Sequence, residues 1–171
     1  AQDLNKTLDE EIELYKGVGQ AALGADVKGH KSTAIGYASL NAQSFSSSTD
    51  SHNTAVGYFS GVSISTGIQN TLIGSSAGDA LTDADYNVAI GSFALTADTK
   101  GSKNIAIGHS ALGTQNLTSS TDLYNVAIGH QAGVAITTAG TNTIIGGLAG
   151  ATMTAAGSSN VILGFQAGNV V

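Results

Sequence analysis

Eight copies of a short string ending in glycine dominate this sequence and restrict its fold more than any other feature. The copies are STAIG, NTAVG, NTLIG, NVAIG, NIAIG, NVAIG, NTIIG and NVILG, so asparagine opens all but the first. Their glycines are Gly36, Gly57, Gly74, Gly91, Gly108, Gly129, Gly146 and Gly164, whose sequence numbers rise in steps of 21, 17, 17, 17, 21, 17 and 18. A nearly fixed period of this length is typical of chains that stack one small unit on the next.

Two short insertions account for the two steps of 21. They occupy residues 47–50 and 119–122, and both carry the letters SSTD. Their sequence numbers differ by 72, which is one step of 21 plus three steps of 17. The insertions therefore indicate a larger repeat of four units.

The residues before each glycine alternate as they do in a β-strand. A β-branched residue lies three places before the glycine, usually alanine two places before it, and isoleucine, valine or leucine directly before it. This period of two in a short, glycine-bounded stretch predicts one strand per unit. Alternating pairs such as Val62/Ile64 and Val134/Ile136 predict a second, weaker strand after the glycine. Two strands and two turns per unit predict an all-β fold, a parallel β-solenoid (β-roll) of about eight 17-residue coils over residues 32–171.

In such a stack each residue lies above its copy, so repeated positions form columns with one role each. The aliphatic column directly before glycine is expected to fill the interior. The glycine column is expected to form a turn that needs positive φ or no Cβ. The asparagine column is expected to form a ladder of side-chain amides that closes the turn before each strand. Its members are Asn53, Asn70, Asn87, Asn104, Asn125, Asn142 and Asn160.

The segment before Gly17 contains no glycine and follows a different pattern. Leu8, Ile12 and Tyr15 take the d, a and d positions of a heptad, with Asn5 at the preceding a position. This spacing predicts a short coiled-coil helix over residues 1–16. Residues 17–31 are expected to form a neck, in which the AALG of residues 21–24 resembles a degenerate coil ahead of the eight.

Charge and composition exclude several classes of function. The chain has six lysines, no arginine and twelve acidic residues, for a net charge of −6, so no basic surface for nucleic acid is expected. It has no cysteine, which excludes disulfides, thiolate metal sites and cysteine nucleophiles. No apolar run approaches the roughly 20 residues that a membrane-spanning helix needs, so no membrane insertion is predicted.

The C-terminal part of the chain carries no charged side chain. From residue 123 to residue 171 there is no Asp, Glu, Lys or Arg. Such a surface stays soluble more easily if much of it is buried between chains, and a thin coil leaves apolar area that three chains could bury. The sequence therefore predicts a homotrimer whose chains are aligned by the N-terminal heptads.

Strings of the NVAIG type, stacked after a coiled-coil segment, resemble the head domains of trimeric autotransporter adhesins, which are trimeric β-rolls. The NTAVG spelling and the longer 17-residue unit resemble even more the repeats in receptor-binding tail fibres of bacteriophages. The resemblance covers residues 32–168. It implies a segment of a trimeric fibre that attaches to a host cell-surface glycan or protein receptor, joined to other fibre segments in a virion. The alternative is an adhesin head on a bacterial cell surface. The autotransporter unit is shorter, so no functional residue is carried over.

The two insertions are the first candidates for receptor binding, because long loops are where repeat proteins place binding functions. Residues 43–52 and 115–124 are expected to protrude from one edge, four coils or about 19 Å apart. Their polar groups suit hydrogen bonding to carbohydrate hydroxyls, although tolerated excursions of the chain would look the same. The candidates are Ser47, Ser48, Thr49, Asp50, His52, Ser119, Ser120, Thr121 and Asp122.

A second set of candidates follows the repeat glycine. Tyr37, Tyr58, His109 and His130 occupy this column together with Phe165, and the two histidines are expected to stack one coil apart. Three interpretations remain open: a packed or solvated ladder, an aromatic patch that stacks on sugar rings, or a ring of three histidines around a metal at a threefold axis. The first is favoured, and neither a metal nor a cofactor is predicted.

Little in the sequence indicates catalysis. Asp79, Asp83 and Asp85 are the one carboxylate cluster in the repeats; it would suit calcium or acid/base chemistry but more simply caps turns. We therefore predict a structural and receptor-binding protein rather than an enzyme, with a polysaccharide depolymerase as the weaker alternative. Ice binding by a threonine column is undercut, because Thr33, Thr54 and Thr71 give way to valine and isoleucine in later coils.

Overall fold

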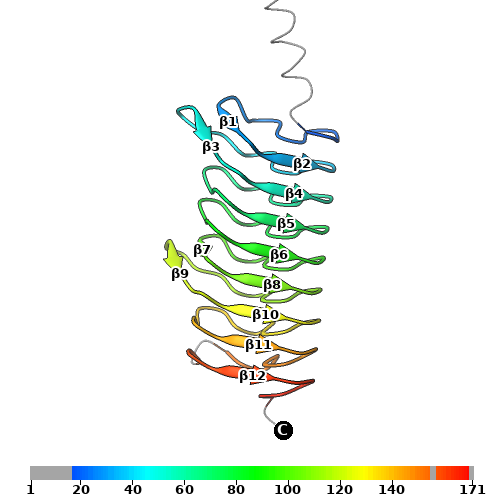
Figure 1. The fold of residues 1–171 in the computed structure, drawn as a ribbon, viewed down its shortest axis with the longest axis vertical. Helices are drawn as coiled ribbons and strands as arrows, with labels where there is room; N and C mark the ends of the chain where they lie inside the picture. Colours follow the sequence, from blue (N-terminus) through cyan, green and yellow to red (C-terminus); the bar gives the residue numbers. More distant parts are fainter. Residues whose placement is uncertain (1–16, 155–156, 170–171) are drawn as a thin grey trace, which may run out of the picture.

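The computed structural model describes residues 17–154 and 157–169, and the coiled-coil helix predicted over residues 1–16 lies outside them. Throughout the described residues the chain is all-β and winds into a parallel β-solenoid whose coils stack along one axis (Figure 1). The predicted solenoid is confirmed. Within these residues no helix has the length and apolarity needed to cross a membrane.

One parallel sheet runs along the stack and takes one short strand from each coil. Each strand residue pairs with its copy in the next coil, so that Ile90 lies beside Ile107. Eight strands make seven steps of about 4.8 Å, or roughly 34 Å along the axis. In pairing order the strands are β2 (Thr33–Ile35), β4 (Thr54–Val56), β5 (Thr71–Ile73), β6 (Val88–Ile90), β8 (Ile105–Ile107), β10 (Val126–Ile128), β11 (Thr143–Ile145) and β12 (Val161–Leu163).

Two small parallel sheets form where the insertions lie. The strand β1 (Gly29–His30) pairs with β3 (Thr49–Asp50), and β7 (Gly101–Ser102) pairs with β9 (Thr121–Asp122). Both small sheets lie on the same edge of the stack (Figure 1). The second strand of each pair belongs to an insertion, so each insertion is tied by its backbone to the preceding coil.

The glycine column forms the turn that the sequence predicts. All eight repeat glycines have positive φ, between 121° and 142°. At Gly91, where φ is 129°, an added Cβ would lie 2.7 Å from the carbonyl carbon and oxygen of Gly108 in the next coil. The position therefore excludes a side chain both because of its backbone conformation and because the coils approach closely.

The asparagine column forms the predicted ladder. The backbone N–H of Asn87 donates to Oδ1 of Asn70 at 3.0 Å, and that of Asn104 donates to Oδ1 of Asn87 at 2.9 Å. The amide nitrogen of Asn87 also donates to the carbonyl of Gly101 at 2.9 Å, which closes the turn before the next strand. From Asn53 to Asn142 every member is fully buried, so each hydrogen bond satisfies a group that has no access to water.

The prediction for the interior is wrong, because the aliphatic residue before each glycine points outward. The middle residue of the strand points inward instead: Ala34 is 2% exposed, whereas Ile35 is 42% exposed. The outer side of the sheet, which we call the sheet face, therefore carries two columns, one half threonine and half aliphatic and the other aliphatic throughout. The first is Thr33, Thr54, Thr71, Val88, Ile105, Val126, Thr143 and Val161. The second is Ile35, Val56, Ile73, Ile90, Ile107, Ile128, Ile145 and Leu163.

The interior is filled mainly from the return segment, the stretch that runs from each repeat glycine back to the next strand. Leu40, Leu95 and Leu112 lie four places after a repeat glycine and are fully buried opposite a strand alanine. Where the strand residue is large, as at Leu72 and Ile144, the fourth place is glycine. In these coils a large side chain on one side of the narrow core is thus matched by a small residue on the other side.

The predicted second strand is not formed. Left-handed backbone at Phe59 (φ 57°) and Gly61 (φ 58°) turns the chain just before the alternating pair Val62/Ile64. Ile64 is nevertheless fully buried, so the apolar pattern reflects burial rather than strand geometry. Backbone bonds still join the return segments of successive coils, as in Ala42 N–H to Val62 O at 3.0 Å.

A degenerate coil precedes the eight, as the AALG of residues 21–24 predicts. Val18 forms an isolated parallel bridge with Ile35, and Leu23 N–H donates to Ser39 O at 3.0 Å. Gly19 precedes Gly36 by one repeat unit and shares its positive φ. The segment that was expected to be a neck thus contains a coil stacked on the first strand.

The glycine turn generates a stability prediction. Gly91→Ala should destabilise the fold by about 2 kcal/mol or more, because alanine has the wrong backbone preference there and its Cβ would meet backbone that cannot move aside. Gly147→Ala is the matched control, since its Cβ would make an ordinary 3.5 Å contact with Phe165. Chemical denaturation measures both, and equal stabilities of the two variants would contradict the assigned role.

Candidate functional site

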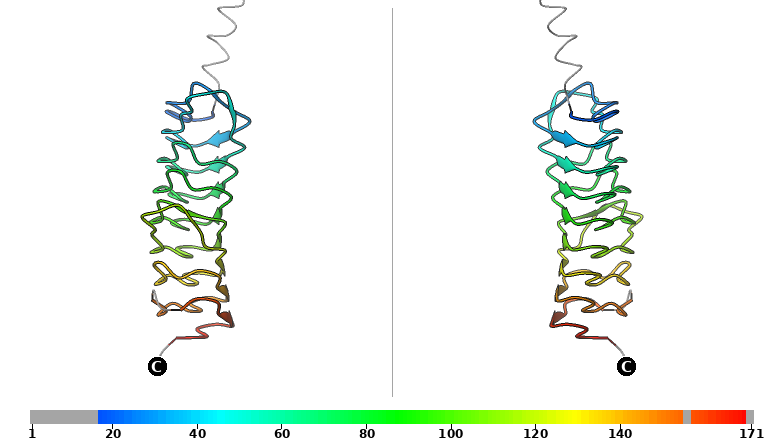
Figure 2. Two further views of the ribbon diagram at one scale, coloured as in Figure 1. Left: turned by 90° about the vertical axis from the view of Figure 1, so that its left-hand side faces the viewer. Right: turned by 90° about the vertical axis from the view of Figure 1, so that its right-hand side faces the viewer.

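The two insertions form protruding arches on one edge of the solenoid. We call residues 43–52 the first arch and residues 115–124 the second arch. They share an edge in Figure 1, where β3 and β9 project beyond the regular coils, and the left view of Figure 2 faces this edge. The side chains of Ser47, Ser48, Ser119 and Ser120 are exposed at their tips.

A buried polar anchor holds the second arch. Nε2 of Gln115 donates to Oδ2 of Asp98 at 2.6 Å, and Oε1 of Gln115 accepts from the side chain of Asn125 at 2.9 Å. Oδ1 of Asp98 accepts the backbone N–H groups of Gly101 at 3.0 Å and Leu117 at 3.3 Å. The first three of these residues are fully buried, and one carboxylate and one amide, those of Asp98 and Gln115, replace apolar side chains in the core where the arch leaves the stack.

The first arch has an equivalent anchor, four coils earlier in the stack. Gln43 donates to Asp26 at 2.6 Å and accepts from Asn53 at 2.9 Å, while Asp26 accepts the N–H of Gly29 at 2.7 Å. The predicted four-coil repeat therefore extends to buried side chains. Because each buried polar group is satisfied within a connected network, the arches are held in one conformation rather than left as free loops.

An ion pair and a histidine cover the first arch. Nζ of Lys31 lies 2.6 Å from Oδ2 of Asp50, and the hydrogen bond between them holds the pKa of Asp50 below its ordinary value. Nε2 of His30 and the hydroxyl of Ser48 are 3.0 Å apart. His52 is exposed beside this group, so the surface offers donors and acceptors with paired charges.

The second arch repeats the ion pair and adds an aromatic ring. Lys103 pairs with Asp122, and its Nζ lies 3.1 Å from the hydroxyl of Tyr124 and 5.2 Å from the centre of that ring. Hydrogen bonds to Asp122 and Tyr124 raise the pKa of Lys103 above its ordinary value. The lysine is therefore charged at every physiological pH.

A second ion pair borders this arch. Lys100 lies 3.6 Å from Asp83, and the hydroxyl of Ser120 donates to the same carboxylate at 3.2 Å. Burial alone would raise the pKa of Asp83, but hydrogen bonds from Thr82 and Ser120 outweigh that effect and hold it below its ordinary value. The arch tip is thereby fastened to a carboxylate two coils back.

The column after the repeat glycine lies on the opposite edge. Tyr37 and Tyr58 stack with ring centres 5.5 Å apart, and Phe59 packs against Tyr58 at 4.2 Å. His109 and His130 stack at 5.2 Å, as the sequence predicts. The four rings of the column are exposed and Phe59 is partly buried, so the column faces solvent in the single chain. No cluster of three or more metal-binding side chains occurs in the part of the single chain that the structure describes.

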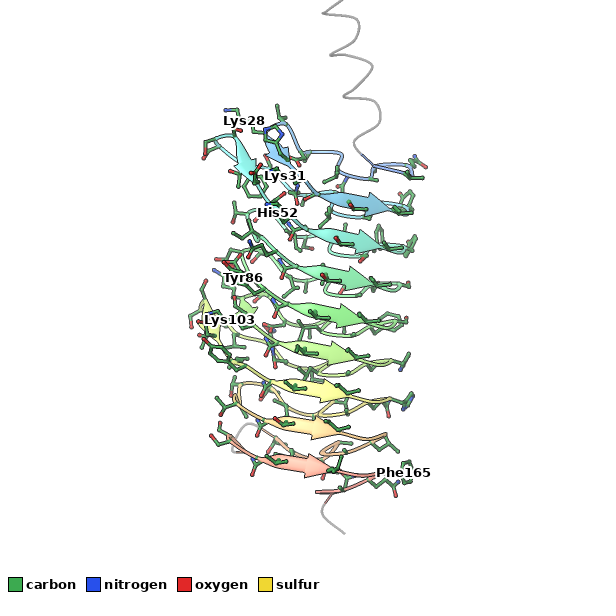
Figure 3. The ribbon with its side chains drawn as sticks, in the orientation of Figure 1. Lys28, Lys31, His52, Tyr86, Lys103 and Phe165 are labelled. Carbon is green, nitrogen blue, oxygen red and sulfur yellow. The ribbon has the colours of Figure 1, made fainter. Side chains whose placement is uncertain are left out.

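The predicted candidates therefore separate into two groups that the fold does not bring together. Figure 3 shows Lys31, His52 and Lys103 on the arch edge and Phe165, a member of the post-glycine column, on the other. The strand of each coil lies between these edges. A ligand on the arches would not contact Tyr37, Tyr58, His109 or His130 of the same chain.

The three neighbouring aspartates do not converge on one point. Asp79 accepts from Thr96 at 2.6 Å, Asp85 accepts the N–H of Ile68 at 2.8 Å, and Asp83 faces the second arch. Each carboxylate thus fastens one coil to another. These bonds between coils differ from the turn caps that the sequence predicts, and the three carboxylates do not share one site.

Sequence reasoning missed the anchors and the partners of the arches. Asp26, Gln43, Asp98 and Gln115 each lie seven places after a glycine of the repeat column, where other coils have Ile64 or Leu81. A comparison of that position across the coils would have revealed two polar pairs, each just before an insertion. Lys31 and Lys103 are related by the same four-coil offset as the insertions.

Comparison of the chain with protein-family models, curated proteins and solved structures finds no significant match. The assignment of a function therefore rests on the sequence pattern and on the geometry described above.

The anchor generates a second stability prediction. Gln115→Leu should cost about 3 kcal/mol, because it removes the side-chain amide donor of the buried Asp98 carboxylate and one of the two acceptors of the Asn125 amide. The same change at exposed Gln69 should alter stability by no more than about 0.5 kcal/mol. Denaturant unfolding measures the cost, and limited proteolysis should show earlier cleavage within residues 115–124. An unchanged second arch in Gln115→Leu would refute the anchor.

Proposed function

We propose that this protein is a structural and receptor-binding segment of a homotrimeric fibre, of the bacteriophage tail-fibre type, that attaches a particle to a host cell surface. The observation that carries the proposal is the sheet face, an apolar surface that runs along the whole stack. The arches on a separate edge provide the surface for a receptor.

The sheet face supports burial against other copies of the chain. Its inner neighbours are mostly alanines, so the largest aliphatic side chains of most strands lie outside the coil rather than in its core. Ile73 is 38% exposed and Ile105 and Ile145 are each 36% exposed, in the middle of the stack as well as near its end. Contiguous apolar surface of this length is typical of an interface rather than of a monomer's exterior.

Parallel association around a common axis would match the columns of one chain with those of its neighbours. Each coil contributes one row to the sheet face, so chains aligned at the same height would bury equivalent rows together. The number three follows from the resemblance to trimeric fibres, and the heptads predicted over residues 1–16 would align the three chains. Figure 2 shows the strands on one side of the rod and the return segments on the other, which leaves the arches accessible beside such an interface.

The arches support a binding role because they are rigid and repeated. Each is held by a buried carboxylate and a small parallel sheet, which reduces the ordering cost of binding. Their hydroxyls and paired charges suit a host cell-surface glycan, with a protein receptor as the alternative. An adhesin head on a bacterial surface would use the same geometry and is the alternative setting. A depolymerase is less well supported, because the clustered aspartates each bond to a different partner.

The interface generates a prediction about mass in solution. The wild-type chain should sediment as three copies of 16.9 kDa, and Ile107→Asp should dissociate them, because it places three charges in an apolar interface. Val62→Asp, on the return segment, is the control and should remain trimeric. A wild-type mass of one chain, or a trimeric Ile107→Asp, would refute the proposed interface.

The arches generate a prediction about attachment. Deletion of residues 47–50 and 119–122 together restores the regular repeat spacing and should abolish binding to host cells while leaving the trimer intact. Fluorescently labelled protein and flow cytometry measure attachment, and sedimentation checks assembly. Full attachment by the shortened trimer would contradict a receptor-binding role for the arches.

A further inference from the structure

A column of variable side chains runs along the arch edge, one residue from each coil. Its members precede the repeat asparagine or serine, all have left-handed backbone with φ between 50° and 62°, and we call them the ridge. They are Lys31, His52, Gln69, Tyr86, Lys103, Tyr124, Thr141 and Ser159. Unlike the glycine, asparagine and inward columns, the ridge has no common chemistry, so stacking alone does not determine which side chains stand there.

Three consecutive members of the ridge form a coherent group beside the second arch. Tyr86 is 49% exposed and Tyr124 is 53% exposed, while Lys103 stands on the coil between them. Figure 3 shows Tyr86 and Lys103 on the same edge of the stack. The two tyrosines are two coils apart, which corresponds to about 10 Å along the axis.

The lysines around this group are paired with carboxylates, and Asp85, which accepts the backbone N–H of Ile68, adds one negative charge beside Tyr86. Lys103 pairs with Asp122 and Lys100 with Asp83, so both lysines that flank β7 are matched by carboxylates. Such a surface offers hydrogen-bond donors and acceptors to hydroxyl groups without a net attraction for a polyanion. Beside it, Tyr86 and the side of the Tyr124 ring away from Lys103 present flat apolar faces with a polar tip.

We propose that the ridge from Tyr86 to Tyr124 binds an uncharged, linear glycan that lies parallel to the fibre axis. Sugar rings stack on the two tyrosines, and hydroxyls between them bond to Lys103, Asp122 and the rim of the second arch. This inference rests on the proposed attachment function and specifies its ligand and its place. A linear glycan suits this surface because it has a sugar ring at regular intervals along its length, and the ridge has one side chain at each coil.

The first arch supplies an internal comparison. It has the same anchor and the same lysine–aspartate pair, but His52 stands where the second arch has Tyr124, and the ridge members Lys31, His52 and Gln69 include no tyrosine. The first arch should therefore bind the glycan far more weakly. On the opposite edge, Tyr37, Tyr58 and Phe59 pack on one another, which covers part of the ring faces that a sugar would need.

Affinity electrophoresis of the full chain tests the proposal, with uncharged linear glucans, mannans, galactans and xylans as probes and a sulfated galactan for comparison. At least one uncharged glycan should retard the wild-type protein, to the same extent at low and high salt. Tyr86→Ala and Tyr124→Ala should each weaken that binding roughly fivefold to tenfold. Tyr124→His gives the second arch the ridge residue that the first arch has at His52, and it should weaken binding similarly without loss of stability.

Phe93→Ala is the control, because Phe93 is 44% exposed on the other edge of the same coil as Tyr86. Equal weakening by Phe93→Ala, retention only by the sulfated glycan, or no retention by any uncharged glycan would overturn the proposal. Attachment of the Tyr86→Ala/Tyr124→Ala double variant to host cells at the wild-type level would overturn it as well, while leaving the attachment function in place. A failure of the attachment function appears separately, as a monomeric wild-type protein or as undiminished attachment after both arches are shortened.

Discussion

The pairing of each strand residue with its own copy in the next coil is the constraint on which the rest of this structure depends. Ile90 beside Ile107 and Val126 beside Thr143 are two steps of one register that is kept from β2 to β12. Under this constraint each repeated position forms a column along the axis. Glycine is needed at the turn where the backbones of successive coils approach closely. An asparagine such as Asn87 bonds both to Asn70 of the preceding coil and to the carbonyl of Gly101 in the turn before the next strand.

The insertions show how length can be added without losing that register. β2 and β4 remain paired although the coil between them is longer than the regular unit, because the extra chain leaves at the edge and not in the sheet. The opening in the core is closed by polar groups: Asp98 and Gln115 take the position that Ile64 and Leu81 occupy in regular coils. A buried, satisfied network thus replaces apolar packing at the two places where the chain projects a surface.

Many residues of the candidate site could be predicted from the repeat pattern, but their separation onto two edges of the solenoid could not. Alignment on the glycines predicted the stacked His109–His130 pair and two equivalent insertions. It did not separate the arches from the aromatic column, because the distance between His52 and Tyr58 depends on a strand that carries the chain from one edge to the other. Lys103 and Tyr124 were missed for a related reason: their contact crosses coils and joins positions that are far apart in the sequence.

The repeat alone determined that the chain forms a parallel solenoid with one strand per unit, glycine turns and an asparagine ladder. Only the tertiary structure decided which face of each strand lies inside. A period of two shows that alternate residues point to opposite faces, but it does not show which face is buried. The interior is too narrow for large side chains from both sides, so Leu40 and Leu112 on the return segment leave room only for alanine on the strand. The larger isoleucines and valines are thereby displaced to the exterior, and the apolar sheet face of this protein is the consequence.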